Sequence, residues 1–184
     1  MMSSHAARVC ISVPAARSVF EREGDPDHVL MTGNPVRRSV IEGDRVRGRR
    51  ALDVPEDTTL LLVFGGSLGA QHLNERVASL KNENLYVLHS TGADGFEDTE
   101  RALALTPEEA KRYRVQPYID NMGDMLAAAD LVLSRSGASS VAEIAALAVP
   151  SVLVPYPHAT ADHQTTNARY LVDAGAGVLC ADVD

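Results

Sequence analysis

The sequence predicts an α/β protein built on a doubly wound parallel sheet, because strand-like apolar runs alternate with helical patterns from about residue 59 onward. Runs such as "LLLVF" and "DLVLS" are continuously apolar and not apolar at every second position. Continuous runs are typical of parallel strands, since helices cover both faces of such a sheet. Residues 36–184 are therefore expected to form a Rossmann-like domain that binds ligands at the carboxyl ends of its strands.

The expected elements follow one another with short connections. The segment "TPEEAKRY" shows the clearest helix start, with a Thr cap, Pro at the first helical position and early glutamates. The strands are expected at 58–64, 84–92, 114–119, 130–134, 150–156 and 176–180. The helices are expected at 70–80, 106–113, 121–129, 139–148 and 163–175.

The first 35 residues fit this alternation less well. "RVCISV" and "HVLMTG" are strand-like, but "EREGDPD" between them leaves no room for a full crossover helix. Residues 1–35 are expected to be the end of a preceding domain. The charged segment that follows is expected to be a connector with one or two helical turns, most of whose arginines are solvated. These arginines are Arg37, Arg38, Arg45, Arg47, Arg49 and Arg50.

Composition excludes several classes of protein. The formal charge of -8 argues against a general nucleic-acid binder. Cys10 and Cys180 are far apart and lack metal-ligand spacing, so neither a disulfide framework nor a zinc site is expected, and a reducing cytoplasm is the natural setting. No apolar run reaches the roughly 18 residues that a membrane span needs. Any membrane contact is expected to be peripheral.

A glycine-rich turn follows the first predicted strand of the domain. "GGSLGA", Gly65 to Ala70, lets the backbone approach an anion closely, although tight strand-to-helix turns also use glycine for steric reasons. A dinucleotide fold would require an acidic residue about 20 positions on, at the end of the next strand. Asp94 lies beyond that strand, in a glycine-flanked loop, which disfavours NAD.

"SRSGASSVAE", Ser134 to Glu143, combines a run of small residues with a helix start. Uncovered N–H groups at a helix N-terminus attract phosphate, yet Glu143 would repel a phosphate beside it. One alternative is a capping box between Ser140 and Glu143. The other is a nucleoside diphosphate, with its phosphates at the bare turn and its ribose hydroxyls on Glu143.

Polar residues also gather after the strand at 150–156, in "HATADHQTTNA". Asp162 is expected to be an N-cap, the common role of an aspartate there. Gln164 suits a ligand rich in hydroxyl groups, because an amide offers both a donor and an acceptor. His163 and Asn167 lie beside it.

Four motifs in this order, "TGNPVR", "GGSLGA", "RSGASSVAEIAALAVPSVLVPYP" and "DHQTTNA", resemble the MurG family. The resemblance covers nearly the whole chain from about residue 30. It implies the GT-B architecture of two facing Rossmann-like domains, this chain being mainly the donor-binding one. It also implies inverting transfer of N-acetylglucosamine from its UDP donor to a lipid-linked muramoyl pentapeptide at the cytoplasmic face of the membrane.

The resemblance assigns roles to individual residues of this sequence. It implies a phosphate-side contact for Arg37, a diphosphate contact for Ser67, a backbone contact to uracil at Ile119, and a sugar contact for Gln164. Weaker candidates are Gly66, Leu68, Gly69, Asp162, His163 and Asn167. The stretch around the phosphates and ribose comprises Ala138, Ser139, Ser140, Val141, Ala142 and Glu143.

The chain departs from the family pattern at both ends. The glycine-rich turn ending in histidine that opens the acceptor domain does not occur here, and the sequence stops before the terminal helices of this architecture. A fragment without the acceptor site and its general base is therefore expected, inactive on its own. No Asp-x-Asp motif is present, so no metal or cofactor requirement is expected. The alternatives are a nucleotide-sugar-binding module without catalysis and a GT-B transferase with another lipid or small-molecule acceptor.

Overall fold

The structure is a computed structural model that describes residues 5–21, 25–65, 70–80 and 84–182. It divides into two compact units, Met1–Val36 and Arg37–Asp184. In the first unit, β1 (Val9–Ile11) and β2 (Val29–Met31) pair in parallel, with Val9 opposite Val29. Among the described residues of the segment between them are η2 (Pro14–Ala16), the one-turn helix α1 (Arg17–Phe20) and η3 (Pro26–His28).

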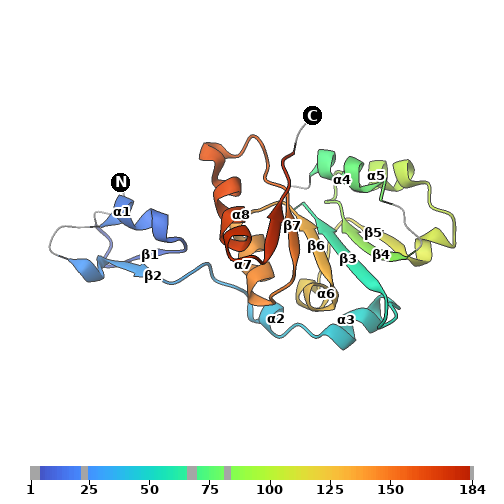
Figure 1. Ribbon diagram of the computed structural model, residues 1–184, viewed down its shortest axis with the longest axis horizontal. Coiled ribbons are helices and arrows are strands. Elements are labelled where there is room, and N and C mark those ends of the chain that lie inside the picture. Colours follow the sequence, from blue (N-terminus) through green and yellow to red (C-terminus); the bar gives the residue numbers. More distant parts are fainter. Residues whose placement is uncertain (1–4, 22–24, 66–69, 81–83, 183–184) are drawn as a thin grey trace. The chain divides into compact units, whose positions relative to one another are not determined.

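The second unit contains the predicted doubly wound parallel sheet, with six strands in the order β5-β4-β3-β6-β7-β8 (Figure 1). The strands are β3 (Thr59–Phe64), β4 (Leu85–Ser90), β5 (Tyr113–Gln116), β6 (Leu131–Ser134), β7 (Ser151–Leu153) and β8 (Gly177–Leu179). The chain enters the sheet at β3, moves outward to β5, and then crosses back to β6 beside β3. This order reverses the direction of winding between β3 and β6, as in Rossmann folds.

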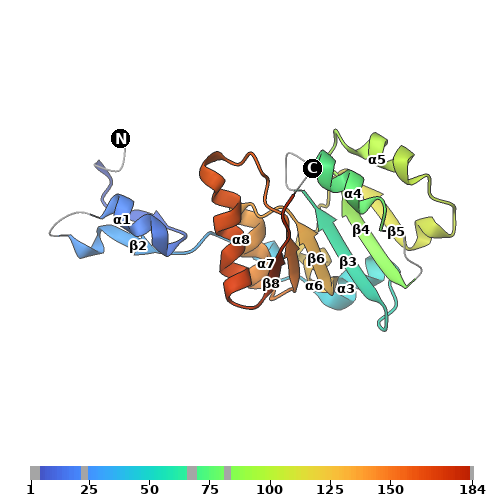
Figure 2. The same cartoon turned by 45° about the horizontal axis from the view of Figure 1, so that its top comes forward.

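Helices cover both faces of the sheet (Figures 1 and 2). The helices are α2 (Arg38–Ile41), α3 (Arg45–Ala51), α4 (Gln71–Val77), α5 (Phe96–Leu103), α6 (Met122–Ala128), α7 (Ala138–Ala146) and α8 (His163–Asp173). The pair α4 and α5 packs together, and so does the pair α7 and α8. Leu62, Leu88 and Leu153, from three different strands, are almost fully buried, which explains why the strands read as continuous apolar runs.

Two local predictions were wrong. Helix α5 was not predicted, because half of its residues are charged and its large apolar side chains are only Phe96 and Leu103, two turns apart. The helix predicted at 106–113 is only the 3-10 turn η4 (Glu109–Lys111). The predicted Thr cap does form, since the Thr106 hydroxyl accepts a hydrogen bond from the Glu109 N–H at 3.3 Å, but the chain enters β5 at Tyr113 and ends the turn.

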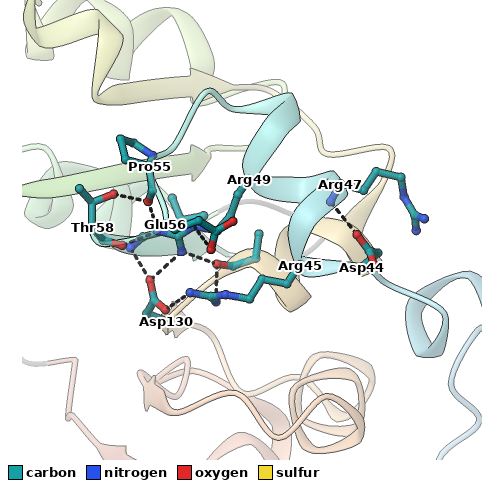
Figure 3. A network of polar contacts seen from close by, with 10 residues as sticks. Asp44, Arg45, Arg47, Arg49, Pro55, Glu56, Thr58 and Asp130 are labelled. Atoms are coloured by element: carbon teal, nitrogen blue, oxygen red, sulfur yellow. Dashed lines mark hydrogen bonds and ion pairs between the residues drawn. The ribbon is translucent and has the colours of Figure 1, made fainter.

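The arginine-rich connector also differs from the expectation, because several of its arginines hold α3 to the sheet. Arg49 is only 1% exposed, and its guanidinium donates to Asp130 at 3.0 Å and to the carbonyls of Pro55 and Thr58 (Figure 3). Arg45 donates to the other oxygen of Asp130 at 2.7 Å. The prediction that most of the six arginines are solvated is confirmed for Arg37, Arg38, Arg47 and Arg50, which are exposed, but it was wrong for Arg49.

Close packing of α3 on α6 explains why an arginine becomes buried there. Gly48 lies at the contact, where a Cβ atom would approach the Asp124 carbonyl oxygen to 2.3 Å and the Ala128 Cβ to 2.8 Å. Only glycine allows this approach of the two backbones. Arg47, in the same helix, forms a two-pronged ion pair with Asp124 at 2.5 and 2.6 Å.

A polar network lies within the core between α4, β4 and β5. His89 is fully buried, with Nδ1 3.1 Å from the Tyr113 hydroxyl and Nε2 3.0 Å from Asn74 Oδ1. The Asn74 amide nitrogen donates to the Thr91 carbonyl, so its oxygen faces the ring and must accept. Nε2 therefore carries the proton of a neutral His89, and Nδ1 accepts from Tyr113.

This network makes stability depend on pH. Burial lowers the pKa of His89 to about 4, whereas an unfolded histidine titrates near 6.5. As pH falls from 6.5 towards 4, His89 becomes protonated in the unfolded chain but stays neutral in the folded protein. The free energy of unfolding therefore decreases, by up to about 3 kcal/mol below pH 4. Urea unfolding at pH 7, 6 and 5 should show this loss. The variant His89→Gln should have a shallower slope, and equal slopes would contradict the assignment.

Candidate functional site

The reversal of strand order places the candidate site at the carboxyl ends of β3 and β6. These two strands are neighbours, with Phe64 opposite Ser134. The segments that leave them run to opposite sides of the sheet, which opens a crevice in folds of this type. "GGSLGA" follows β3 and "RSGA" follows β6, so both phosphate-binding candidates begin at this point. Of the first motif, Gly66, Ser67, Leu68 and Gly69 lie outside the described residues.

Helix α7 begins at this crevice with no side chain covering its N-terminus. Its N-cap is Gly137, and no side chain makes a capping hydrogen bond there. Ala138 and Ser139 are exposed, and the first intrahelical bond runs from the Val141 N–H to the Gly137 carbonyl. The N–H groups of residues 138–140 therefore precede the helical hydrogen-bond pattern, at the positive end of the helix dipole.

The capping-box alternative is wrong. The helix starts two residues earlier than Ser140, which makes Ser140 its third residue and not its N-cap. Glu143 instead forms an ion pair with Arg37, at 3.2 Å between Oε1 and Nη2. The Glu143 side chain is 14% exposed and that of Arg37 is 59% exposed. Two predicted site residues from distant parts of the sequence thus form a contact. The guanidinium of one and the carboxylate of the other could each bind a ligand instead.

The remaining residues of the α7 stretch differ in burial. Val141 is buried beneath the helix, and Ala142 and Ser140 are partly exposed. Ile119 is only 3% exposed, in the connection between β5 and α6. Its side chain belongs to the core, which leaves its backbone as the group that can meet a ligand.

The polar cluster before α8 is ordered by its own hydrogen bonds. Asp162 occupies the N-cap position as expected, but its carboxylate accepts from the Thr165 hydroxyl at 2.6 Å and caps no backbone N–H. Its φ of 51° is left-handed, which turns the side chain away from the usual capping geometry. His163 Nδ1 donates to the Thr160 carbonyl at 2.8 Å.

Gln164 and Asn167 connect α8 with its neighbours. The Gln164 Oε1 atom accepts from the Tyr156 N–H at 3.0 Å. Because the amide oxygen is used in this way, its NH2 group remains as a donor for a ligand. The Asn167 Nδ2 atom donates to the Ser136 carbonyl at 3.1 Å, which fixes the turn that precedes α7. The structure therefore links the α7 and α8 candidates directly.

Sequence reasoning missed a charged cluster at the same edge of the sheet. Arg135, directly after β6, is 6% exposed and forms an ion pair with Asp182 at 2.6 Å. The other oxygen of Asp182 lies 2.5 Å from Nδ1 of His72. Although burial acts to raise it, hydrogen bonds from Arg135 and His72 lower the pKa of Asp182. Arg135 stands inside a quoted motif, whereas nothing in the sequence pattern distinguishes Asp182.

No group of His, Cys, Asp and Glu suited to a metal ion occurs among the residues that the structure describes. Likewise, no helix in the described ranges has the length and apolar character needed to cross a membrane.

Comparison with known proteins identifies the family to which the chain belongs. Residues 60–184 match the glycosyltransferase family 28 C-terminal domain. The chain belongs to this family. The family 28 match begins at the second residue of β3 and includes the segments that follow β3, β6 and β7. The predicted Rossmann-like α/β class and the resemblance to the MurG family are both confirmed.

Individual relatives of this family 28 chain agree. A protein of Nitratidesulfovibrio vulgaris (strain DP4) described as "UDP-N-acetylglucosamine--N-acetylmuramyl-(pentapeptide) pyrophosphoryl-undecaprenol N-acetylglucosamine transferase" is 42% identical over 188 residues, which cover 100% of this chain and 49% of that protein. A Desulforamulus reducens protein with the same description is 40% identical, over 86% of this chain and 45% of its own length.

Solved structures show the same correspondence. The structure of MurG from Acinetobacter baumannii superposes with a TM-score of 0.70 at 32% identity, covering 98% of this chain and 55% of that one. A calicheamicin glycosyltransferase, CalG4, shares the fold with a TM-score of 0.61 at 20% identity. The chain spans about half the length of the curated relatives it matches.

Proposed function

We propose that this chain binds UDP-N-acetylglucosamine and serves as the donor-binding part of an inverting transferase. The observation that carries the proposal is the uncapped N-terminus of α7 at the strand-order reversal, with Glu143 one turn inside the helix. A diphosphate at the N–H groups of residues 138–140 is stabilised by the helix dipole. A ribose diol at Glu143 would donate hydrogen bonds to its carboxylate, which accounts for a negative charge near a phosphate site.

The other residues fit around such a donor. Arg37 supplies a mobile positive charge, because its side chain is 59% exposed and held by a single carboxylate. The free NH2 of Gln164 offers donors to sugar hydroxyls, and Ser67 is assigned to the diphosphate. When the acceptor hydroxyl attacks the anomeric carbon, the departing UDP gains charge that the α7 terminus stabilises. This chemistry uses no metal or other cofactor.

The acceptor and the setting complete the proposal. The relatives' description names a pyrophosphoryl-undecaprenol acceptor carrying N-acetylmuramyl-pentapeptide. We assign the same lipid-linked acceptor to the complete protein, together with the cytoplasmic face of the membrane as a peripheral location. Residues 1–35 would then be the end of the acceptor domain, which supplies the general base. The present chain alone is expected to bind the donor without transferring the sugar.

A charge placed on the bare turn tests the phosphate role. Ser139→Glu should weaken UDP binding roughly tenfold, because its carboxylate would lie within a few ångströms of the phosphates. The same change should not lower the melting temperature, since a negative charge in the first helical turn stabilises a helix. Isothermal titration with UDP and with uridine measures the effect. The matched control Ser139→Gln should bind UDP almost as wild type does, and unchanged affinity in Ser139→Glu would refute the phosphate role.

A further inference from the structure

Both terminal nitrogens of the Arg135 guanidinium have partners within the protein, although the group lies next to the proposed phosphate turn. Its Nη1 atom donates to the carbonyls of Val154 and Pro155 at 3.2 and 3.1 Å. Its Nη2 atom lies 2.6 Å from Asp182, and the group sits 5.6 Å from the centre of the Tyr156 ring. With 6% of the side chain exposed, Arg135 has little surface left for a ligand.

Asp182 joins three segments that leave the carboxyl edge of the sheet. It follows β8, whose continuation is held beside β7 by a hydrogen bond from the Cys180 N–H to the Leu153 carbonyl. Its two oxygens reach Arg135 after β6 and His72 in α4, the helix that follows β3. Its side chain is 9% exposed, so these contacts are largely shielded from water. Shielded charge-assisted hydrogen bonds with good geometry are stronger and more directional than surface pairs.

The turn after Arg135 is fixed by neighbouring hydrogen bonds as well. The Ser134 hydroxyl donates to the Arg135 carbonyl at 3.0 Å, and Asn167 donates to the Ser136 carbonyl at 3.1 Å. With both carbonyls and the Arg135 side chain held, the direction of the following N–H groups is restricted. Ser136 is fully buried, and its hydroxyl has no hydrogen-bond partner among the residues that the structure describes.

We propose that Asp182 and His72 form a clamp on Arg135 that positions the turn Ser136–Ala138 for a nucleoside diphosphate. This inference rests on the proposed function. It adds to the donor site a role for Arg135 as a positioning residue and not as a phosphate ligand. The clamp also pairs the positive charge of Arg135 with a carboxylate, so the phosphates are held by N–H groups and the helix dipole. Preorganised N–H groups of this kind need not reorient when charge develops on the leaving group.

The two possible roles of Arg135 predict changes of opposite sign for one substitution. If Arg135 were a phosphate ligand, Asp182→Asn would free its guanidinium and tighten UDP binding. If the clamp positions the turn, Asp182→Asn should weaken UDP binding roughly tenfold, since a charge-assisted hydrogen bond is lost. Binding of uridine, which has no phosphate, should stay within about twofold of the wild-type value.

The experiment combines isothermal titration of this chain with amide NMR spectra recorded without ligand. Asp182→Asn should shift the N–H resonances of Gly137 and Ala138, a readout that does not depend on UDP. Arg135→Lys keeps the charge but loses the planar fork, and should reproduce both effects if Asp182→Asn proves too unstable. The control Asp173→Asn removes an equal charge from the exposed end of α8, and it should change neither the UDP affinity nor the N–H resonances of the turn.

The outcomes separate the two proposals. UDP binding that is unchanged or tighter in Asp182→Asn refutes the clamp and leaves the donor site intact. Equal losses for UDP and uridine also refute it, because a general structural defect would then explain the result. If wild type does not bind UDP, the proposed function fails. The NMR spectra then still decide the clamp, which is refuted if the turn resonances do not move.

Discussion

Replacing Glu143 with alanine is expected to weaken UDP binding by roughly 1.5 to 3 kcal/mol, while binding of 2',3'-dideoxy-UDP hardly changes. The reason is that, in the proposed donor site, the carboxylate would accept charge-assisted hydrogen bonds from the ribose diol, which the dideoxy analogue lacks. Since Ser140 is not the N-cap of α7, removal of Glu143 costs no capping interaction. Only the partly exposed pair with Arg37 is lost, so the free energy of unfolding should fall by at most about 1 kcal/mol.

The ion pair with Arg37 requires a control of its own. Glu143→Ala also releases Arg37, and any effect of this release acts equally on both nucleotides because both carry the diphosphate, so the difference between the two ligands isolates the ribose contact. Arg37→Gln should therefore weaken UDP and the dideoxy analogue by similar factors, in contrast to Glu143→Ala. Calorimetric titrations of wild type and both variants with both nucleotides make this comparison. Equal losses of the two ligands in Glu143→Ala would remove the ribose assignment, and Glu143 would then be only the partner of Arg37.

Replacing Arg49 with methionine is expected to cost about 3 to 5 kcal/mol of unfolding free energy. The side chain is 1% exposed, and its loss leaves Asp130 without one of its cations and removes the guanidinium donor from the Thr58 and Pro55 carbonyls, of which Pro55 keeps hydrogen bonds from Thr58. Arg49→Lys retains the charge but cannot reach all three acceptors, so an intermediate loss is expected. Unfolding in guanidinium chloride, with the midpoint and slope both recorded, measures these differences.

The neighbouring arginine provides the matched control for this experiment. Arg50 follows in the same helix but is exposed, so Arg50→Met should change stability by no more than about 0.5 kcal/mol. If Arg49→Met and Arg50→Met destabilise the protein equally, the buried network of Figure 3 does not hold α3 to the sheet. UDP binding by folded Arg49→Met should be close to wild type, because Asp130 precedes β6 and lies at the opposite end of that strand from the α7 terminus.

The local sequence pattern was sufficient to predict most strands and helix α7. Strands β3, β4 and β6 were predictable because burial on both faces requires continuous apolar runs, and α7 was predictable as a helix with a bare N-terminus. The candidate site followed from the same reasoning, since polar and small residues just after parallel strands gather at one edge of the sheet. Helix α5 was missed because its apolar face is short, with Phe96 and Leu103 as its only large apolar side chains among charged residues.

Tertiary structure alone decided how the charged residues pair. Glu143 meets Arg37 across 106 positions of sequence, and Asp182 meets His72 across 110. The sequence does not show which arginines are buried, so the difference between the neighbouring Arg49 and Arg50 appears only when α3 packs on α6. The sequence by itself thus determined the sheet and the location of the proposed phosphate-binding turn. Which charges face a ligand and which hold the fold together depended on the packing of distant segments, because ion pairing is set by distance in space and by exclusion of water.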